Sequence, residues 1–235
     1  MTLTFSDTTF DAVICLNGDL PTGAEIEVIG HHPMIAADGA ANTLVQAGII
    51  PEFVVGDLDS VEEATLSALH GIAELVHDHD QDTTDFEKAL RFAERMMWKR
   101  LCIIGIHGGD FEHTLNNWSV LVRLGRSLHL TAYDRGRYAI PMYESFSYHA
   151  LENELLSLVP QPHARITTSG LVWNITDDLL ALGHREGARN RAQDAHVTVD
   201  MHEGSLLFFC TARMPFAPAV TVTSDVTSEA REQQP

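Results

Sequence analysis

The chain has 235 residues, of which 45% are hydrophobic, so it can bury a substantial core as one large domain or two small ones. Its 33 acidic and 15 basic residues give a formal net charge of −18, which argues against a basic surface for nucleic acid or an anionic membrane. The sequence contains no run of about 18 apolar residues, so we expect no membrane-spanning segment.

The first part of the chain alternates short apolar runs with helical patterns. The expected strands are 13–16, 34–37, 53–55, 73–76, 101–106 and 128–133. The expected helices are 40–47, 62–70, 84–98 and 113–124; within 84–98, helical spacing relates Phe86, Leu90, Ala93 and Met97. Alternation with such short connections predicts a parallel sheet with helices on both faces.

The pattern changes near residue 143 to strand-like runs without a convincing helix. The expected strands there are 155–159, 165–168, 172–175, 179–182, 196–199 and 206–211. This spacing predicts a small antiparallel β-sandwich. We therefore expect an α/β domain over 1–142, a β-sandwich domain over 143–215 and, from composition, a mobile tail over 216–235.

The three cysteines, Cys15, Cys102 and Cys210, each lie in an apolar run, and their spacing does not suit zinc. We expect reduced thiols, as in the cytoplasm. Residues 1–11 have neither the basic nor the apolar region of a secretion signal, which also favours a cytoplasmic location.

The most informative stretch is Val54–Ser60, an apolar run that ends in Gly56, Asp57, Leu58 and Asp59. It places two acids at the carboxyl edge of a sheet, where open α/β folds bind ligands. Two close carboxylates repel unless a cation lies between them, and Mg²⁺ prefers carboxylate and phosphate oxygens. The first interpretation is a Mg²⁺–nucleotide site; the alternative is that Asp57 and Asp59 cap a helix near Val61.

Other strand ends carry further polar groups. Asp38 follows the strand 34–37, and Asp85 opens the helix after the strand 73–76, with Lys88 on the same helical face. Helix N-termini attract phosphate, and Lys88 would add a positive charge; the alternative is a plain surface ion pair. Four acids therefore follow three successive strands, and the glycine pair at 108–109 follows the next.

At this point several segments resemble the thiamine pyrophosphokinase family. The similarity runs in order over roughly residues 13–210, and the combination of 56–60 with 80–90 is its most specific part. The matching segments are Asn17-Gly18, 37–42, 48–51, 56–60, 80–90, 108–109 with 113–115, and 167–174.

The resemblance implies an α/β domain that binds ATP and Mg²⁺, followed by a β domain that helps to bind thiamine. It also implies a homodimer with the active site at the subunit interface. The implied reaction transfers the terminal pyrophosphoryl unit of ATP to the hydroxyl of thiamine and releases AMP.

Site residues follow from the same resemblance. Asp57, Asp59 and Asp85 would hold Mg²⁺, with Asp38 nearby as a fourth catalytic acid. The expected nucleotide contacts are Asn17, Gln81, Asp82, Thr84, Lys88, Gly109 and His113. The expected thiamine contacts are Trp173, stacked on the rings, with Thr168, Ser169 and Asn174 beside it.

Some roles stay open at this stage. Either Asp38 or Asp85 could accept the proton of the attacking hydroxyl, because spacing does not choose between them. Trp173 could hold the cationic thiamine by a cation–π contact, or it could be a core residue of the β-sandwich. The histidines at 31–32, 77 and 79 could bind a transition metal, although solvated loop residues are the favoured interpretation.

The chain departs from the family at residues 108–113. Asp110 stands where an arginine is usual, and Glu112 stands where an aspartate is usual. Replacing a phosphate-binding guanidinium by a carboxylate motivates two alternatives: transfer to another hydroxymethyl heterocycle, such as a pterin or thiamine analogue, or a non-catalytic nucleotide- or thiamine-binding protein.

Overall fold

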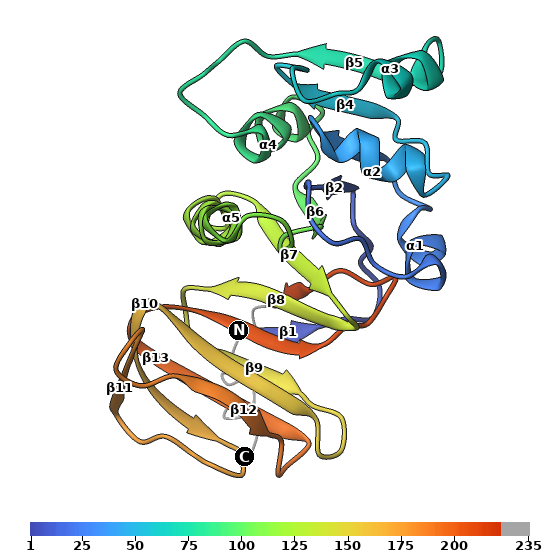
Figure 1. Cartoon of the computed structure of the whole chain (residues 1–235). Helices are drawn as coiled ribbons and strands as arrows, with labels where there is room; N and C mark the ends of the chain where they lie inside the picture. Colours follow the sequence, from blue (N-terminus) through green and yellow to red (C-terminus); the bar gives the residue numbers. More distant parts are fainter. Residues whose placement is uncertain (222–235) are drawn as a thin grey trace, which may run out of the picture.

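The computed structural model describes residues 1–221, in which fourteen strands form one hydrogen-bonded sheet (Figure 1). One half of the sheet is parallel, in the order β7-β6-β2-β3-β4-β5. Its strands are β2 (Ala12–Cys15), β3 (Met34–Ala37), β4 (Phe53–Gly56), β5 (Glu74–His77), β6 (Arg100–Ile104) and β7 (His129–Asp134).

Helices cover both faces of this parallel half, as the sequence predicts. Alternate residues of β2 show why: Val13 and Cys15 pack with α1, α2 and α3, whereas Ala12 and Ile14 pack with α4 and α5. Burial on both faces accounts for the apolar runs of these strands. The helices are α1 (Gly23–Ile29), α2 (Ala40–Gln46), α3 (Glu63–Leu69), α4 (Asp85–Arg95) and α5 (Phe111–Leu124).

The antiparallel half continues the same sheet. β8 (Arg137–Met142) pairs with β7 on one side and with β13 (His196–Thr211) on the other. β1 (Thr2–Thr4), from the start of the chain, lies in this half between β9 and β14. The other strands are β9 (Phe146–His149), β10 (Leu155–Ser169), β11 (Asp178–Ala181), β12 (Gly187–Arg191) and β14 (Ala219–Thr221).

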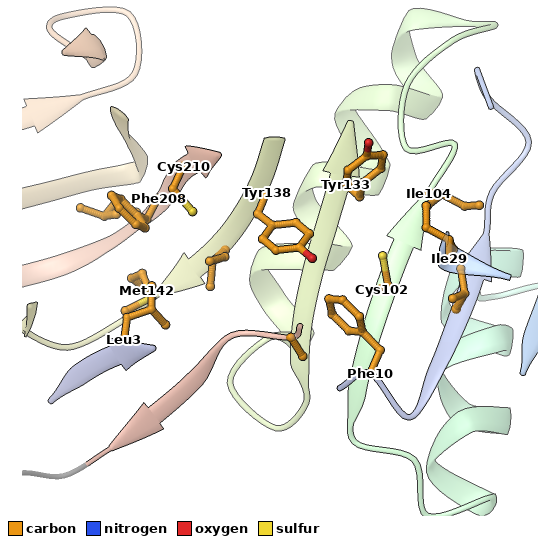
Figure 2. Close-up of a cluster of buried hydrophobic side chains, with 14 of the residues drawn as sticks. Leu3, Phe10, Ile29, Cys102, Ile104, Tyr133, Tyr138, Met142, Phe208 and Cys210 are labelled. Carbon is orange, nitrogen blue, oxygen red and sulfur yellow. The ribbon is translucent and has the colours of Figure 1, made fainter. Parts of the chain in front are cut away.

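A buried cluster joins the two halves across β7 and β8. Tyr138 of β8 lies between Phe10 and Cys102 of the parallel half and Phe208 and Cys210 of the antiparallel half (Figure 2). The ring centroids of Phe10 and Tyr138 are 6.0 Å apart. The core is therefore continuous through the junction near residue 142. Within residues 1–221 no helix is both long and apolar enough to cross a membrane.

The mixed α/β fold class is confirmed, and several details are corrected. The expected strands 155–159 and 165–168 are one strand, β10, and 196–199 and 206–211 are likewise one strand, β13, because bulges bend each strand without ending it. The expected strand 172–175 is wrong, because this segment forms a loop after Gly170, whose φ is +77°. Met97, expected on the apolar face of α4, is exposed because the helix ends at Arg95.

The tail prediction needs one further correction. Residues 216–221 are not free, since Phe216 bridges to Thr9 and β14 pairs with β1. Both partners belong to the start of the chain, and composition alone gives no sign of that pairing. The rest of the expected tail, 222–235, lies outside the described residues.

Candidate active site

Three of the expected acids meet at the carboxyl ends of β3 and β4. One carboxylate oxygen from each of Asp38, Asp57 and Asp59 lies within 4.8 Å of the other two. Parallel pairing of β3 with β4, with Ala37 opposite Val55, brings these strand ends together. Asp38 is buried, Asp57 is half-buried and Asp59 is exposed, so the cluster opens from the sheet edge toward solvent.

The backbone at this cluster is strained in a way that aims the acids. Asp38 and Leu58 have φ angles of +45° and +63°, a region that residues other than glycine rarely adopt. Gly56 makes room for Asp38, because a Cβ at Gly56 would lie 2.7 Å from the Asp38 Cβ. Neither Asp57 nor Asp59 caps the next helix, since the N-cap of α3 is Glu62, so the capping alternative is wrong.

Asp85 reaches the cluster through Lys88. Thr84 caps α4, with its side chain accepting from the Glu87 amide, and this sets the first turn of the helix. The Lys88 Nζ lies 2.9 Å from an Asp85 carboxylate oxygen and 3.5 Å from one of Asp57. Lys88 is buried, so the plain surface ion pair considered for the sequence is excluded.

The electrostatics distinguish the acids from one another. The hydrogen bond from Gln81 and the positive charge of Lys88 hold the pKa of Asp57 below its ordinary value. Burial, together with the charges of Asp85 and Asp57, raises the pKa of Asp38 against the opposing hydrogen bond from Ser60. The Asp38 Oδ1 atom is buried without a hydrogen-bond partner among the described residues. Three carboxylates this close together, one of them with an unpartnered oxygen, form an arrangement that a hard cation completes.

A cavity of about 280 Å³ adjoins the cluster. Among the expected residues, Asn17, Asp38, Thr84, Asp85 and His113 line it, while Gln81 is held at Asp57. Asp82 is exposed nearby in the loop before α4, and Gly109 follows the lining residue Gly108. The structure thus gathers residues from four connections, those after β2, β3, β5 and β6, around one opening.

Three residues with polar side chains line this cavity but were not among the predicted site residues: Ser60, Asn116 and Asn117. Ser60 donates its amide to Asp38, and the Asn117 side chain donates to the Ile106 carbonyl. The spacing of the two asparagines could have indicated them as site residues, because they follow His113 by three and four residues and so lie on the same face of α5.

The glycine pair after β6 serves the packing of two loops. Gly108 has a φ of +108°, and a Cβ there would lie 2.6 Å from the Asp19 amide nitrogen. The close approach at this glycine is therefore to the loop after β2, which carries Asn17. That packing brings Asn17 and His113 to the same opening.

The expected thiamine contacts lie in the other half of the molecule. Thr168 and Asn174 shape the loop after β10, where their side chains receive the amides of Ile175 and Leu171. Ser169 shares a hydrogen bond with Thr198 of β13. Trp173 has 61% of its surface exposed, so it is not a core residue. Figure 1 shows β10 and β13 at the opposite end of the molecule from β4 and α4, so one chain does not bring these residues to the acids.

The departures at residues 110 and 112 lie at the start of α5. Asp110 is the N-cap residue, and both Asp110 and Glu112 are exposed. Arg123 does not replace the missing guanidinium at the acids, because it pairs with Glu87 at 2.8 Å. His77 and His79 stack with ring centroids 3.8 Å apart, but the cluster of metal-capable groups in residues 1–221 contains aspartates alone.

The acidic cluster and the polar cavity lie at the carboxyl edge of a parallel sheet, which is where α/β proteins bind their ligands. The fold and the site are therefore those of a ligand-binding α/β protein. Residues 29–132 match the family model described as "Thiamin pyrophosphokinase, catalytic domain". The chain is therefore similar to the thiamine pyrophosphokinase family, whose model matches this α/β part of it.

Individual relatives agree over most of the chain. Thiamine pyrophosphokinase 1 of Oryza sativa subsp. japonica is 27% identical over 217 residues, which span 80% of this chain and 82% of the relative. Thiamine pyrophosphokinase of Bacillus subtilis (strain 168) is 25% identical over 75% of this chain and 86% of its own length. The crystal structure of yeast thiamin pyrophosphokinase has the same fold, with a TM-score of 0.75 over 88% of this chain and 87% of that chain at 16% identity.

Proposed function

We propose that this protein transfers the pyrophosphoryl group of ATP to the hydroxyl of thiamine, giving thiamine diphosphate and AMP. The observation that supports this most is the gathering of Asp38, Asp57, Asp59 and the Asp85–Lys88 pair at one sheet edge, within the residues that match the catalytic-domain model of this family. Transfer of this kind depends mainly on positioning and on charge stabilisation, which such a cluster supplies.

The acids fit Mg²⁺ as the resident cation. Asp57 and Asp59 would supply carboxylate oxygens, with Asp38 beside them in the same cluster, whereas Asp85, the third expected ligand, is paired with Lys88. When bound, the cation would offset the negative charge of the phosphates. Lys88 keeps Asp85 and Asp57 in place, and its charge adds to the same effect.

The nucleotide would occupy the cavity beside these acids. Asn17, Thr84 and His113 line it, and Gln81, Asp82, Lys88 and Gly109 lie around it. The N-termini of α4 and α5 face phosphate oxygens favourably. Asp38 is the better candidate to accept the hydroxyl proton, because Asp85 is already paired with Lys88 at 2.9 Å.

Thiamine would be bound by Trp173, Thr168, Ser169 and Asn174 of a second copy of the chain. Five strands separate β10, which ends at Ser169, from β3 in the sheet, so the two sets of residues lie about 29 Å apart along it at ~4.8 Å per strand. An exposed tryptophan face suits a cationic ring system. We therefore infer a homodimer whose active sites each combine the acids of one copy with the Trp173 loop of the other. The chain also has three buried, unpaired cysteines, which favour a location in the reducing cytoplasm.

The activity is tested by measuring AMP formed from ATP with and without thiamine and Mg²⁺. We expect AMP only when both are present, and at least a roughly hundredfold loss in Asp57→Asn and Asp85→Asn. Asp194→Asn, an exposed acid in the loop before β13, is the matched control and should turn over normally. Normal turnover in either site variant would remove that residue from the mechanism.

The shared site is tested by mixing two inactive variants. Asp57→Asn and Trp173→Ala should each be inactive alone, while their co-expression should restore about a quarter of wild-type activity, because half of the dimers are mixed and each carries one intact site. Absence of any restoration in a confirmed mixture would contradict the interface site.

Asp110 and Glu112 favour a second candidate reaction, in which the pyrophosphoryl group is transferred to another hydroxymethyl heterocycle. Both carboxylates are exposed at the start of α5, beside His113 of the cavity. A panel of thiamine, pterin and thiamine analogues, read by AMP release, separates the two reactions. Turnover of thiamine alone excludes this candidate, and any turnover excludes a purely binding role.

A further inference from the structure

A small cavity on the antiparallel half of the sheet is lined by two arginines. It measures about 200 Å³, and its walls are Arg137, Leu155, Ser157, Val159, Arg189 and Phe209. These residues come from four neighbouring strands in the order β12-β10-β13-β8. The cavity therefore lies on paired strands and not on a loop, with a register shift between β10 and β12 at Ser157.

The strand register places these side chains on one face. Ser157 lies opposite Phe209, and Phe209 lies opposite Ala139, two residues from Arg137. The intervening Leu156 and Leu158 turn the other way into the buried core. The Arg189 amide donates to the Ser157 hydroxyl at 3.0 Å, which fixes β12 beside β10 at the cavity.

Both arginines lack a counter-charge, which is unusual in a chain with a net charge of −18. Within residues 1–221 neither forms an ion pair, and the Nη2 atom of Arg137 is buried without a hydrogen-bond partner. Burial lowers the pKa of Arg137, and the charge of Arg189 acts in the same direction, so the two guanidinium groups repel.

The carboxylate whose charge acts on Arg137 is engaged elsewhere. Glu154 accepts the amides of Leu151 and Thr211 and pairs with Arg213 at 3.0 Å. Arg189 is exposed and keeps its hydration, whereas the half-buried Arg137 lies on an apolar wall with its Nη2 atom unpartnered, which is costly unless negative charge is supplied.

We propose that Arg137 and Arg189 form a binding site for a phosphate-type oxyanion, separate from the acidic cluster. Guanidinium groups bind phosphate oxygens in pairs, and a dianion matches two positive charges. The cavity measures about 200 Å³ and has room for a phosphate group beside the two guanidinium groups.

The neighbouring surface suggests where the rest of a phosphate ester would lie. A larger apolar cavity of about 560 Å³, between α5 and the sheet, shares Val159 and Phe209 with the arginine cavity. Free phosphate and a phosphate monoester present the same oxyanion, so titrations with inorganic phosphate and with phenyl phosphate, which is neither substrate nor product of the proposed reaction, distinguish the two sources. Tighter binding of phenyl phosphate that is weakened in Arg189→Asn would identify an ester.

The test is calorimetric titration of the full chain with inorganic phosphate in the presence of a chelator. Without a divalent cation, the carboxylates of the acidic cluster repel phosphate, so the titration reports the arginine site. We expect saturable binding in the wild type and at least a tenfold weaker affinity in Arg137→Gln and Arg189→Asn. Asparagine is chosen at 189 because φ there is +58°, a region it tolerates.

The matched control is Arg191→Asn, which removes an exposed arginine of the same strand that bonds to the Asn153 carbonyl. It should bind phosphate like the wild type. Circular dichroism and the unfolding midpoint establish whether each variant is folded. If Arg137→Gln is not folded, Arg189→Asn alone provides the test. Absence of wild-type binding, or equal affinity in a folded site variant, would overturn the proposal whatever the outcome for thiamine turnover.

Discussion

At the scale of single residues, the acidic edge of the sheet concentrates repulsion and strain. Asp38 and Leu58 adopt left-handed backbone angles, and each such residue costs on the order of 1–3 kcal/mol. Asp38 is also buried, with an oxygen that lacks a partner among the described residues. Such features persist where the surrounding structure enforces them, which here is the buried core on both sides of β3 and β4.

Glu154 offers a contrasting case, a buried acid that is fully engaged. Burial alone would raise its pKa, but hydrogen bonds from the Leu151 and Thr211 amides and the charge of Arg213 outweigh it and hold the pKa below its ordinary value of 4.5. The stability contributed by the ionised group is therefore complete above pH 4.5 and is lost as pH falls through the lower, folded-state pKa.

We predict that Glu154→Gln lowers the free energy of unfolding by roughly 3 kcal/mol at pH 7, because it leaves Arg213 without its partner. The difference from the wild type should begin to shrink below pH 4.5, where the carboxyl of the unfolded chain takes up a proton, and should shrink further as pH falls through the lower folded-state pKa. Urea denaturation at pH 7 and pH 4 measures it. Glu203→Gln, in an exposed pair with His163, should change little at either pH, and a pH-independent gap in Glu154→Gln would contradict the assignment.

At the scale of elements, the loop between β5 and α4 is held by one arginine. Arg91 of α4 reaches back to Asp78 at 2.9 Å and to Asp80 at 3.1 Å. Asp80 in turn receives the Asp82 amide and the Thr83 hydroxyl. Arg91 therefore fixes the segment that presents Gln81 and Thr84.

We predict that Arg91→Ala lowers kcat/KM by about 10- to 100-fold through misplacement of this loop. Arg91→Lys should recover little, because a single ammonium cannot reach two carboxylates as the guanidinium does. Arg95→Ala removes an arginine of the same helix that lies over Phe92 and should leave the kinetics unchanged. Steady-state kinetics measured at varied ATP concentration test this prediction. A wild-type kcat/KM in Arg91→Ala would contradict the positioning role.

The elements also show what the sequence could and could not predict. Buried parallel strands such as β3 read clearly as apolar runs, so the acids at their ends could be placed on one edge. The long strands β10 and β13 were divided at their bulges, because a bulge interrupts the alternation of side chains. Helix α1 was missed because it has seven residues and only Ile26 and Ile29 are buried.

At the scale of the whole molecule, the parallel and antiparallel halves share one sheet and one core. β8 lies between β7 and β13, and Tyr138 packs against residues of both halves (Figure 2). The distance between the acids and the Trp173 loop follows from this long sheet, and single-sequence patterns carry no information on strand order. The sequence could thus predict the residues of each half of the site but not their separation.

We predict that a fragment of residues 1–142 does not fold cooperatively. It would lose the β13 partner of β8 and expose the Tyr138 side of the core, both of which the full chain buries. Thermal unfolding followed by circular dichroism compares the fragment with the full chain. A sharp, reversible transition of the fragment would show that the halves are independent domains.

The central claim is that acids from separate strand ends hold one divalent cation, and Mn²⁺ binding followed by electron paramagnetic resonance tests it most directly. The account predicts one tight Mn²⁺ per chain in the wild type, displaced by Mg²⁺, and a loss of at least about tenfold in affinity in Asp57→Asn and in Asp59→Asn. Mn²⁺ binding that is absent from the wild type, or unchanged in both folded variants, would contradict it.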